Sequence, residues 1–436
     1  MPSHRSTDVS IALRPQPVGL FGFPGGHLIL PPSDAPEAPE ALDRMLRGDL
    51  TSPVPAAWTF FVCAARGDTE QAWEELGDQR GELADYNRFV LQPTRERYRQ
   101  LRHSLRGELR ALLQVAAYAC GLDDFVPTAQ NLDGELRALV LATQATAELE
   151  EGNPFAARQL LEEAWETVRD SLPLLAAIYA NQLGELILSL PGGSPQEALS
   201  RFQLAWESAS VSALPLFAAQ VAANLASAYQ RAADGRRGML LEAVKWYQRA
   251  LHEGASLEKA PHLYAFIQNH LGLAYMAMPA VEASDQLRMG IAVQAFREAL
   301  KVYDRETSPQ LWASTQMNLA NALQYLPSSH PAENLARAVD IYEEVLQIRK
   351  RALDPVGYAR VLTNQGNALS HLGEFQRAMK NLAEARTLFR QHELWDEAEE
   401  THRLIEAIHR HHHELHQEDE VNTAAEAAPP SGDSSV

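Results

Sequence analysis

Histidines near residue 410 are the side chains of this chain best suited to metal chemistry. The run HRHHHELHQ begins at His409. On a helix, His409 with His413, and His412 with His416, are four residues apart, so each pair shares a face on which imidazoles can bind a transition metal. The alternative is a solvated helix in which histidine is an ordinary polar residue. Because no carboxylate or thiol site is organised around the run, we favour the alternative and expect no metal or other cofactor.

Other motifs with catalytic potential are incomplete. GFPGGH, from Gly22, lacks the Lys-Ser/Thr of a phosphate-binding loop. HELWD from His392 and HELH from His413 both miss the histidine spacing of a zinc protease helix. No Gly-x-Ser-x-Gly elbow occurs, and the two cysteines, Cys63 and Cys120, form neither a disulfide framework nor a metal-ligand pair. The sequence therefore predicts a protein that is not an enzyme.

Composition narrows the classes of partner. The 436 residues include 57 acidic and 38 basic side chains, a net charge of −19. Such a surface repels phosphate backbones and anionic lipids, so we expect neither nucleic acid nor membrane as a partner. The N-terminus lacks the apolar core of a signal peptide, and the apolar stretch 172–190 is interrupted by Asn181, Gln182 and Glu185. These features favour a cytoplasmic protein.

The elements that position these residues are repeated. Five segments begin with asparagine followed by small and apolar residues, with gaps of 43 to 49 residues: NQLGEL from Asn181, NLASAY from Asn224, NHLGLAY from Asn269, NLANAL from Asn318 and NQGNAL from Asn364. Recurrence within so narrow a range indicates a repeated structural unit.

A second pattern accompanies the first, and it places a large apolar residue between two small ones. Examples are Ala198, Phe202 and Ala205, or Ala292, Phe296 and Ala299. Spacings of four and three put all three side chains on one helical face, where a ring can fit between two close backbones. Prolines 173, 215, 261, 309 and 355 stand eight or nine residues before each asparagine and suit a first helical turn. Each unit is therefore predicted to be a helical hairpin.

These patterns resemble the tetratricopeptide repeat (TPR) family. The best copy of the family motif consists of Asn364, Gly366, Leu369, Gly373, Phe375, Ala378 and Ala385. The resemblance implies an all-α fold, a right-handed superhelical solenoid of TPR-like helical hairpins. The long helices are similar to the repeats that accompany bacterial CHAT proteases and signalling ATPases, although the chain contains no such effector domain.

The expected organisation has five parts. Residues 1–55 are an irregular Pro/Gly-rich arm, 56–130 a helical region, and 131–392 an array of about six hairpins. A capping helix follows over 393–416 and a disordered acidic tail over 417–436. Within 56–130, we expect a helix–turn–helix at 56–77 and one long helix from Pro93 to about Ala119. Six arginines along that helix could dock an acidic partner or pair within the protein.

The resemblance also selects the side chains expected to face a ligand. They lie on the first helix of each hairpin, on the concave side of a superhelix, and form a nearly uncharged wall of amides and hydroxyls. The candidates are Asn224, Ser227, Gln230, Arg231, Asn269, Asn318, Asn321, Gln324, Tyr325, Arg360, Asn364, Asn367 and His371.

Two explanations of the asparagines stay open. An asparagine ladder can pair with the backbone of an extended peptide, or the same amides can satisfy backbone groups within their own hairpins. TPR proteins that grip a C-terminal carboxylate use two lysines and an arginine, and only Arg360 fits that scheme.

The function expected from these features is that of a non-enzymatic scaffold or regulatory adaptor that binds a peptide or protein segment in the groove. The alternatives are a small-molecule- or metal-sensing accessory subunit, with its site between the N-terminal region and the array, and a self-assembling structural scaffold. The sequence does not predict an oligomeric state or the identity of the partner.

Overall fold

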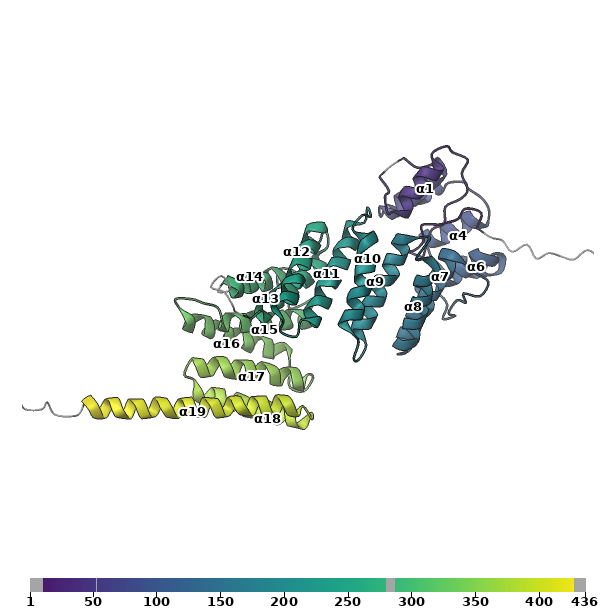
Figure 1. The fold of residues 1–436 in the computed structure, drawn as a ribbon. Helices are drawn as coiled ribbons and strands as arrows, with labels where there is room; N and C mark the ends of the chain where they lie inside the picture. Colours follow the sequence, from purple (N-terminus) through teal and green to yellow (C-terminus); the bar gives the residue numbers. More distant parts are fainter. Residues whose placement is uncertain (1–10, 52, 280–286, 427–436) are drawn as a thin grey trace, which may run out of the picture. The chain divides into compact units, whose positions relative to one another are not determined.

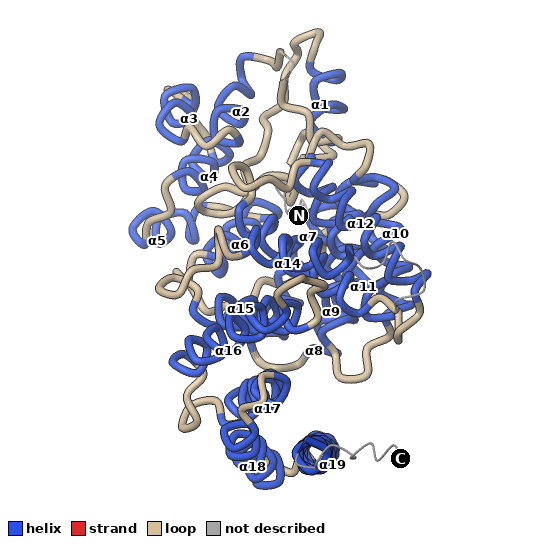
Figure 2. Tube along the Cα trace, turned by 90° about the vertical axis from the view of Figure 1, so that its left-hand side faces the viewer, coloured by secondary structure: helices blue, strands red, loops and turns tan. Residues whose placement is uncertain are grey.

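The computed structural model describes residues 11–51, 53–279 and 287–426, with the side chains of 412–426 excepted. Within these residues, all regular structure is helical, apart from one isolated bridge between Phe23 and Gly26 (Figure 1, Figure 2). The predicted all-α class is confirmed.

The N-terminal helices are short. They are α1 (Ala38–Leu46), η1 (Ala56–Trp58), α2 (Thr59–Ala65), α3 (Thr69–Leu76), α4 (Glu82–Leu91), α5 (Arg95–Ser104) and α6 (Gly107–Ala119). The predicted helix–turn–helix over 56–77 corresponds to η1, α2 and α3, and the Asp68 side chain caps α3 by accepting from the backbone N of Gln71 at 2.9 Å.

Six hairpins follow, each made of two antiparallel helices. They pair α7 (Gly134–Glu150) with α8 (Pro154–Val168), α9 (Pro173–Ser189) with α10 (Pro195–Ala209), α11 (Pro215–Ala232) with α12 (Arg237–Glu253), α13 (Pro261–Ala277) with α14 (Arg288–Ala299), α15 (Pro309–Gln324) with α16 (Pro331–Ile348), and α17 (Pro355–His371) with α18 (Phe375–Gln391). The last helix, α19 (Trp395–Glu426), packs on α18 and extends past the predicted boundary at residue 416. Residues 427–436 of the predicted tail lie outside the described residues.

The chain divides into two compact units. Unit 1 comprises the residues up to Asp234 together with Leu241–Ala255, and unit 2 comprises Gly235–Leu240 and the residues from Ser256 onward. The short N-terminal helices therefore belong to the same compact unit as the first three hairpins.

Proline starts the first helix of five hairpins, as predicted. Pro173, Pro215, Pro261, Pro309 and Pro355 are each the first helical residue. Proline is tolerated there because the first N–H groups of a helix have no intrahelical acceptor. At α17 the Asp354 side chain completes the cap by accepting from the backbone N of Gly357 at 2.8 Å.

The small–large–small pattern forms the contact between the two helices of a hairpin. Phe202 and Phe296 are fully buried. A Cβ placed on Gly184 would lie 2.4 Å from the Phe202 ring, and one on Gly272 would lie 2.7 Å from the Phe296 ring. Each ring therefore occupies space that only a glycine on the first helix leaves open.

These contacts correct the alignment of the repeats. Gly366 packs against Leu382 in the same way. This glycine follows Asn364 by two residues, whereas Gly184 and Gly272 follow Asn181 and Asn269 by three. Asn181 and Asn269 therefore lie one residue nearer the start of their helices than Asn364, and the five asparagines do not occupy one equivalent position.

Two predictions for the N-terminal region were wrong. The arm over 1–55 was expected to be irregular, but it contains α1. Its Pro39 does not prevent the helix, because it falls in the first turn, where proline is compatible with a helix. The single helix expected from Pro93 to Ala119 is broken into α5 and α6. Leu105 and Arg106 have extended backbones, and Gly107, with φ +53°, starts α6 in the left-handed region that glycine tolerates best.

Polar side chains hold the N-terminal arm on α4, α6 and the start of α7. Arg14 donates from Nε to Glu135, from Nη1 to Glu108 at 2.7 Å, and from Nη2 to Asp133 at 3.0 Å. The Asn87 side chain on α4 pairs with both backbone groups of Ile29, at 2.9 and 2.8 Å. Asn87 therefore provides the pairing that a neighbouring strand would otherwise supply.

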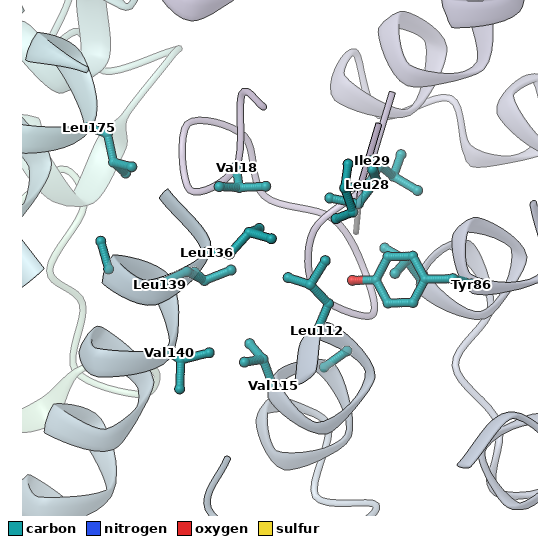
Figure 3. Close-up of a cluster of buried hydrophobic side chains, with 14 of the residues drawn as sticks. Val18, Leu28, Ile29, Tyr86, Leu112, Val115, Leu136, Leu139, Val140 and Leu175 are labelled. Carbon is teal, nitrogen blue, oxygen red and sulfur yellow. The ribbon is translucent and has the colours of Figure 1, made fainter. Parts of the chain in front are cut away.

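Apolar side chains of the arm complete this core. Val18, Leu28 and Ile29 of the arm lie near Leu136 of α7 and Leu112 of α6 (Figure 3). All five are at most 2% exposed, so the arm buries its apolar residues against the array. No described helix is both long and apolar enough to cross a membrane.

Candidate functional site

The predicted groove residues all lie on the first helices of hairpins, or directly after one. They occupy α11, α13, α15 and α17, with Tyr325 capping α15. Their exposure differs. Arg231, Tyr325, Arg360 and His371 are exposed, Asn224 is buried, and the remainder are half-buried: Ser227, Gln230, Asn269, Asn318, Asn321, Gln324, Asn364 and Asn367.

Asn224 joins two consecutive hairpins of unit 1. Its Nδ2 donates to Asn181 Oδ1 at 2.9 Å and to Glu185 Oε1 at 2.7 Å, both on α9. Gln220 donates to Asn224 Oδ1 at 3.3 Å, and Asn181 donates to the same Glu185 oxygen at 3.2 Å. These four residues form what we name the Asn224 network. It connects the side chains of α9 and α11 directly.

A second network, which we name the Tyr342 network, lies in unit 2. Asn367 of α17 donates to Gln324 of α15 at 3.1 Å, and Gln324 donates to the Tyr342 hydroxyl at 2.6 Å. That hydroxyl donates to Asn321. In the same unit, Asn318 donates to Asn269 at 3.2 Å. The partners of these amides are side chains of the same or the neighbouring hairpin, and not the backbone groups considered in the sequence analysis.

We predict that Asn224→Ala destabilises unit 1 by about 1–3 kcal/mol, because Asn181 is 5% exposed and would lose its donor. Asn364 is the matched control. It carries the same signature, is half-buried, and makes no side-chain hydrogen bond among the described residues. Asn364→Ala should change stability by less than about 0.5 kcal/mol. Urea denaturation followed by circular dichroism measures both variants, and equal losses would contradict the structural role of the Asn224 network.

Arg360, the one predicted groove residue that fits the scheme of a carboxylate clamp, already pairs with a carboxylate of the protein. Arg360 Nη2 lies 3.5 Å from Glu397 of α19, and its side chain remains half-exposed. None of the other predicted groove residues within unit 2 is a lysine or arginine.

A cleft of about 1080 Å³ lies in unit 1, between α7 and α9. Both walls come from first helices of consecutive hairpins, at spacings of three and four residues. Its lining includes the apolar Leu139, Leu161 and Leu175 and the polar Thr143 and Gln182. The C-terminal half of α6, the following loop, and Gly19 and His27 of the N-terminal arm also contribute.

One polar group of the cleft has no partner. Tyr179 of α9 is 3% exposed, and its hydroxyl makes no hydrogen bond among the described residues. Burial raises the pKa of this phenol, so it stays protonated and able to donate. A buried hydroxyl left without a partner costs about 1–3 kcal/mol. The hydroxyl is itself buried, so a bound acceptor recovers that free energy only after neighbouring side chains move.

The ionisable groups of the cleft are mainly acidic. Asp123, Asp124, Glu150 and Glu185 contribute to its lining. The hydrogen bond to Glu150, followed by burial, raises the pKa of Tyr118 to about 12. Burial lowers the pKa of His27 to about 4, so this histidine is neutral at pH 7 and adds no positive charge. The cleft therefore suits a ligand with apolar and basic groups.

The repeat signature did not identify this cleft, although the sensor alternative placed a site between the N-terminal region and the array. The repeat signature selects residues by their offset from asparagine, and the first hairpin, α7 with α8, has no such asparagine. The one available signal was the polar and acidic residues of α9, Gln182 and Glu185, which interrupt an apolar run. They were used only to exclude a membrane span.

The histidines and cysteines considered for metal and thiol chemistry do not form a site among the described residues. Among the described residues, no three histidine, cysteine, aspartate or glutamate side chains gather at a point where they could hold a metal ion. The side chains of His412, His413 and His416 lie outside the described residues, and His409 is exposed. Cys63 and Cys120 form no disulfide and are half-buried, and burial raises the pKa of both thiols, which keeps them protonated.

Comparisons with known proteins find distant likenesses of fold alone. No family model and no curated protein matches the chain. Among solved structures, the apo form of RapI is 12% identical and covers 81% of this chain and 96% of its own, with a TM-score of 0.46. Aspartyl phosphate phosphatase F from Bacillus subtilis is 13% identical over 80% of this chain and 90% of its own, with a TM-score of 0.42.

The TPR2AB domain of yeast Sti1, in complex with a pHSP90 peptide, is 18% identical over 62% of this chain and 98% of its own, with a TM-score of 0.24. Likenesses this remote carry no information about function. The TPR-like character of the chain is instead evident in its hairpins, with proline at the helix starts and rings seated on glycine.

Proposed function

We propose that the chain is a non-enzymatic scaffold or regulatory adaptor that holds a segment of a partner protein along the first helices of its hairpins. The observation that carries the proposal is the cleft between α7 and α9, whose lining includes Tyr179, a tyrosine with a buried hydroxyl that has no hydrogen-bond partner among the described residues. The apolar and acidic side chains of the lining favour a segment with apolar and basic side chains.

A peptide is the ligand favoured by the shape of this site. The cleft follows several turns of two helices, from Leu139 to Glu150 on α7 and from Leu175 to Ser189 on α9. An extended segment can place alternate side chains against the apolar lining residues, and one of its carbonyl groups can accept from Tyr179 once neighbouring side chains move.

The predicted groove residues are candidates for further contacts within each unit taken separately. Arg231 is exposed in unit 1. In unit 2, Tyr325 and His371 are exposed, and Asn364 has no side-chain hydrogen bond among the described residues. Residues of the Asn224 and Tyr342 networks are already paired, so we assign them to support of the surface. The resemblance to repeats that accompany CHAT proteases and signalling ATPases makes a signalling protein of that kind a suitable first partner to test.

Tyr179→Phe separates binding from folding. We predict that this variant is as stable as the wild type, or more stable by about 1 kcal/mol, because it removes a buried hydroxyl without a partner. Capture of the partner should fall about tenfold, the equivalent of one lost hydrogen bond to a ligand. The measurement is affinity purification from the native organism with mass spectrometry, followed by titration of the identified partner.

Ser189→Ala is the control for the cleft variant, because Ser189 is an exposed residue at the end of the same lining and already donates to Leu186 O at 2.7 Å. It should bind as the wild type does. If Tyr179→Phe captures the partner as well as the wild type does, the partner binds elsewhere on the array and the assignment of the cleft is refuted.

A small-molecule sensor is the second candidate function, because the volume of the cleft is close to the upper end of the range for small-ligand pockets. Pockets for small ligands span roughly 300–1,000 Å³, and the cleft measures about 1080 Å³. A metabolite screen by thermal shift distinguishes the two, because a small ligand raises the melting temperature without any protein partner.

A further inference from the structure

Five arginines of α5 and α6 form a surface that the proposed function does not use. We name Arg95, Arg99, Arg102, Arg106 and Arg110 the arginine surface. All five are exposed, and in the part of the chain that the structure describes none forms an ion pair. On α5, spacings of four and three place Arg95, Arg99 and Arg102 on one helical face. The backbone is extended at Leu105 and Arg106, so helical spacing does not carry over to Arg106 and Arg110. Arg102 and Arg110 are close to one another because both line the same concavity.

The opposite face of α5 holds the helix in place. Tyr98 and Leu101 are 7% and 9% exposed, and they pack into the core of unit 1. Arg97 is not part of the arginine surface, because its guanidinium stacks 4.6 Å above the Trp73 ring. The arginine surface is therefore a group of exposed arginines on α5, at the break that follows it and on α6, and the buried face of α5 anchors it.

Pairing within the protein was the alternative considered for these arginines, and it occurs elsewhere in unit 1. Arg201 pairs with Glu162 of the neighbouring hairpin at 2.7 Å. On α6, by contrast, Glu108 is occupied by Arg14. The chain has a net charge of −19, so a group of arginines without ion pairs is a local reversal of its overall charge.

A small concavity lies where the two helices meet. It measures about 320 Å³ and is lined by Arg102, His103, Arg110, Gln114, Asp123 and Phe125, with Tyr98 and Leu113. Phe125 is 53% exposed and supplies an apolar contact beside the cations. Asp123 does not neutralise them by an ion pair; its carboxylate accepts from the Tyr98 hydroxyl.

We propose that the arginine surface binds an acidic segment of a protein partner, with its anionic groups between Arg102 and Arg110 and an apolar residue against Phe125. Guanidinium groups bind carboxylates and phosphates through paired, charge-assisted hydrogen bonds. A protein segment fits better than a nucleic acid, because a long polyanion also meets the repulsion of the acidic chain around these arginines. The anionic groups can be glutamate carboxylates or phosphoserines.

The test is fluorescence anisotropy with three labelled probes: a glutamate–leucine peptide, a phosphoserine–leucine peptide and single-stranded DNA. The full-length protein should bind one of the two peptides, more weakly as salt increases, and the tighter peptide identifies the anionic group. Arg102→Gln with Arg110→Gln should weaken that binding at least about tenfold, the equivalent of one charge-assisted contact.

The control is Arg403→Gln with Arg410→Gln, two arginines of α19 that are also exposed and without ion pairs among the described residues. This control should bind as the wild type does. Tyr179→Phe should also bind normally, which separates the arginine surface from the cleft. Failure of both peptides to bind, equal losses in the two arginine pairs, or tighter binding of DNA would each overturn the proposal.

Discussion

Arg14→Met should destabilise unit 1 by about 3–5 kcal/mol, the cost of leaving a buried carboxylate without its cation. The Glu135 side chain is 5% exposed and that of Glu108 is 14% exposed, and both lie on the guanidinium of Arg14. Glu135 also accepts from the backbone N of Gln16 at 3.1 Å, so Arg14 and Glu135 together hold the N-terminal arm on α7.

A second variant tests this explanation. Arg14→Met combined with Glu135→Gln keeps an acceptor for Gln16 and removes the buried charge, so it should recover about 1–2 kcal/mol of the loss. Arg47→Met is the control, because Arg47 forms an exposed pair with Asp43 and should contribute less than about 1 kcal/mol. Urea denaturation measures all three. A small effect of Arg14→Met, or no recovery in the double variant, would contradict the assigned role.

Phe202→Ala should cost about 3–5 kcal/mol, the usual effect of removing a fully buried aromatic ring. Gly184→Ala should also destabilise, by about 1–3 kcal/mol, because its new Cβ would lie 2.4 Å from the Phe202 ring. Gly290→Ala, in the first turn of α14, is the control. No atom lies within 4 Å of its added Cβ, so this change should not destabilise the protein.

The double variant, Phe202→Ala with Gly184→Ala, tests directly whether the ring and the glycine are in contact. Once the Phe202 ring is absent, the methyl group of Gly184→Ala enters the vacated space and should stabilise the protein. The sign of its effect therefore reverses between the two backgrounds, which a double-mutant cycle detects as a coupling free energy. Additive losses would show that the ring and the glycine are not in contact.

The hairpin fold was predictable because its determinants are local. Proline at a helix start and small–large–small spacing act within one or two turns, so the order of residues specifies them. Ring and glycine belong to different helices, but the short connection between them brings every copy together in the same way. The same reasoning failed at two places. In α1, a proline that the first turn tolerates was taken as a sign of irregular structure. Between α5 and α6, a helical spacing of arginines continues in the sequence across the break at Gly107, whose backbone is left-handed.

The candidate site was only partly predictable. The sequence by itself determined the helical class, the hairpin units and which residues lie on the first helices. Only the tertiary structure decided that Asn224 is paired across hairpins while Asn364 is not, that Tyr179 is buried without a partner, and that Arg14 pairs with three carboxylates. The pairings join residues 39 or more positions apart, whose distances are set by how complete helices pack, and no local spacing in the sequence encodes such distances.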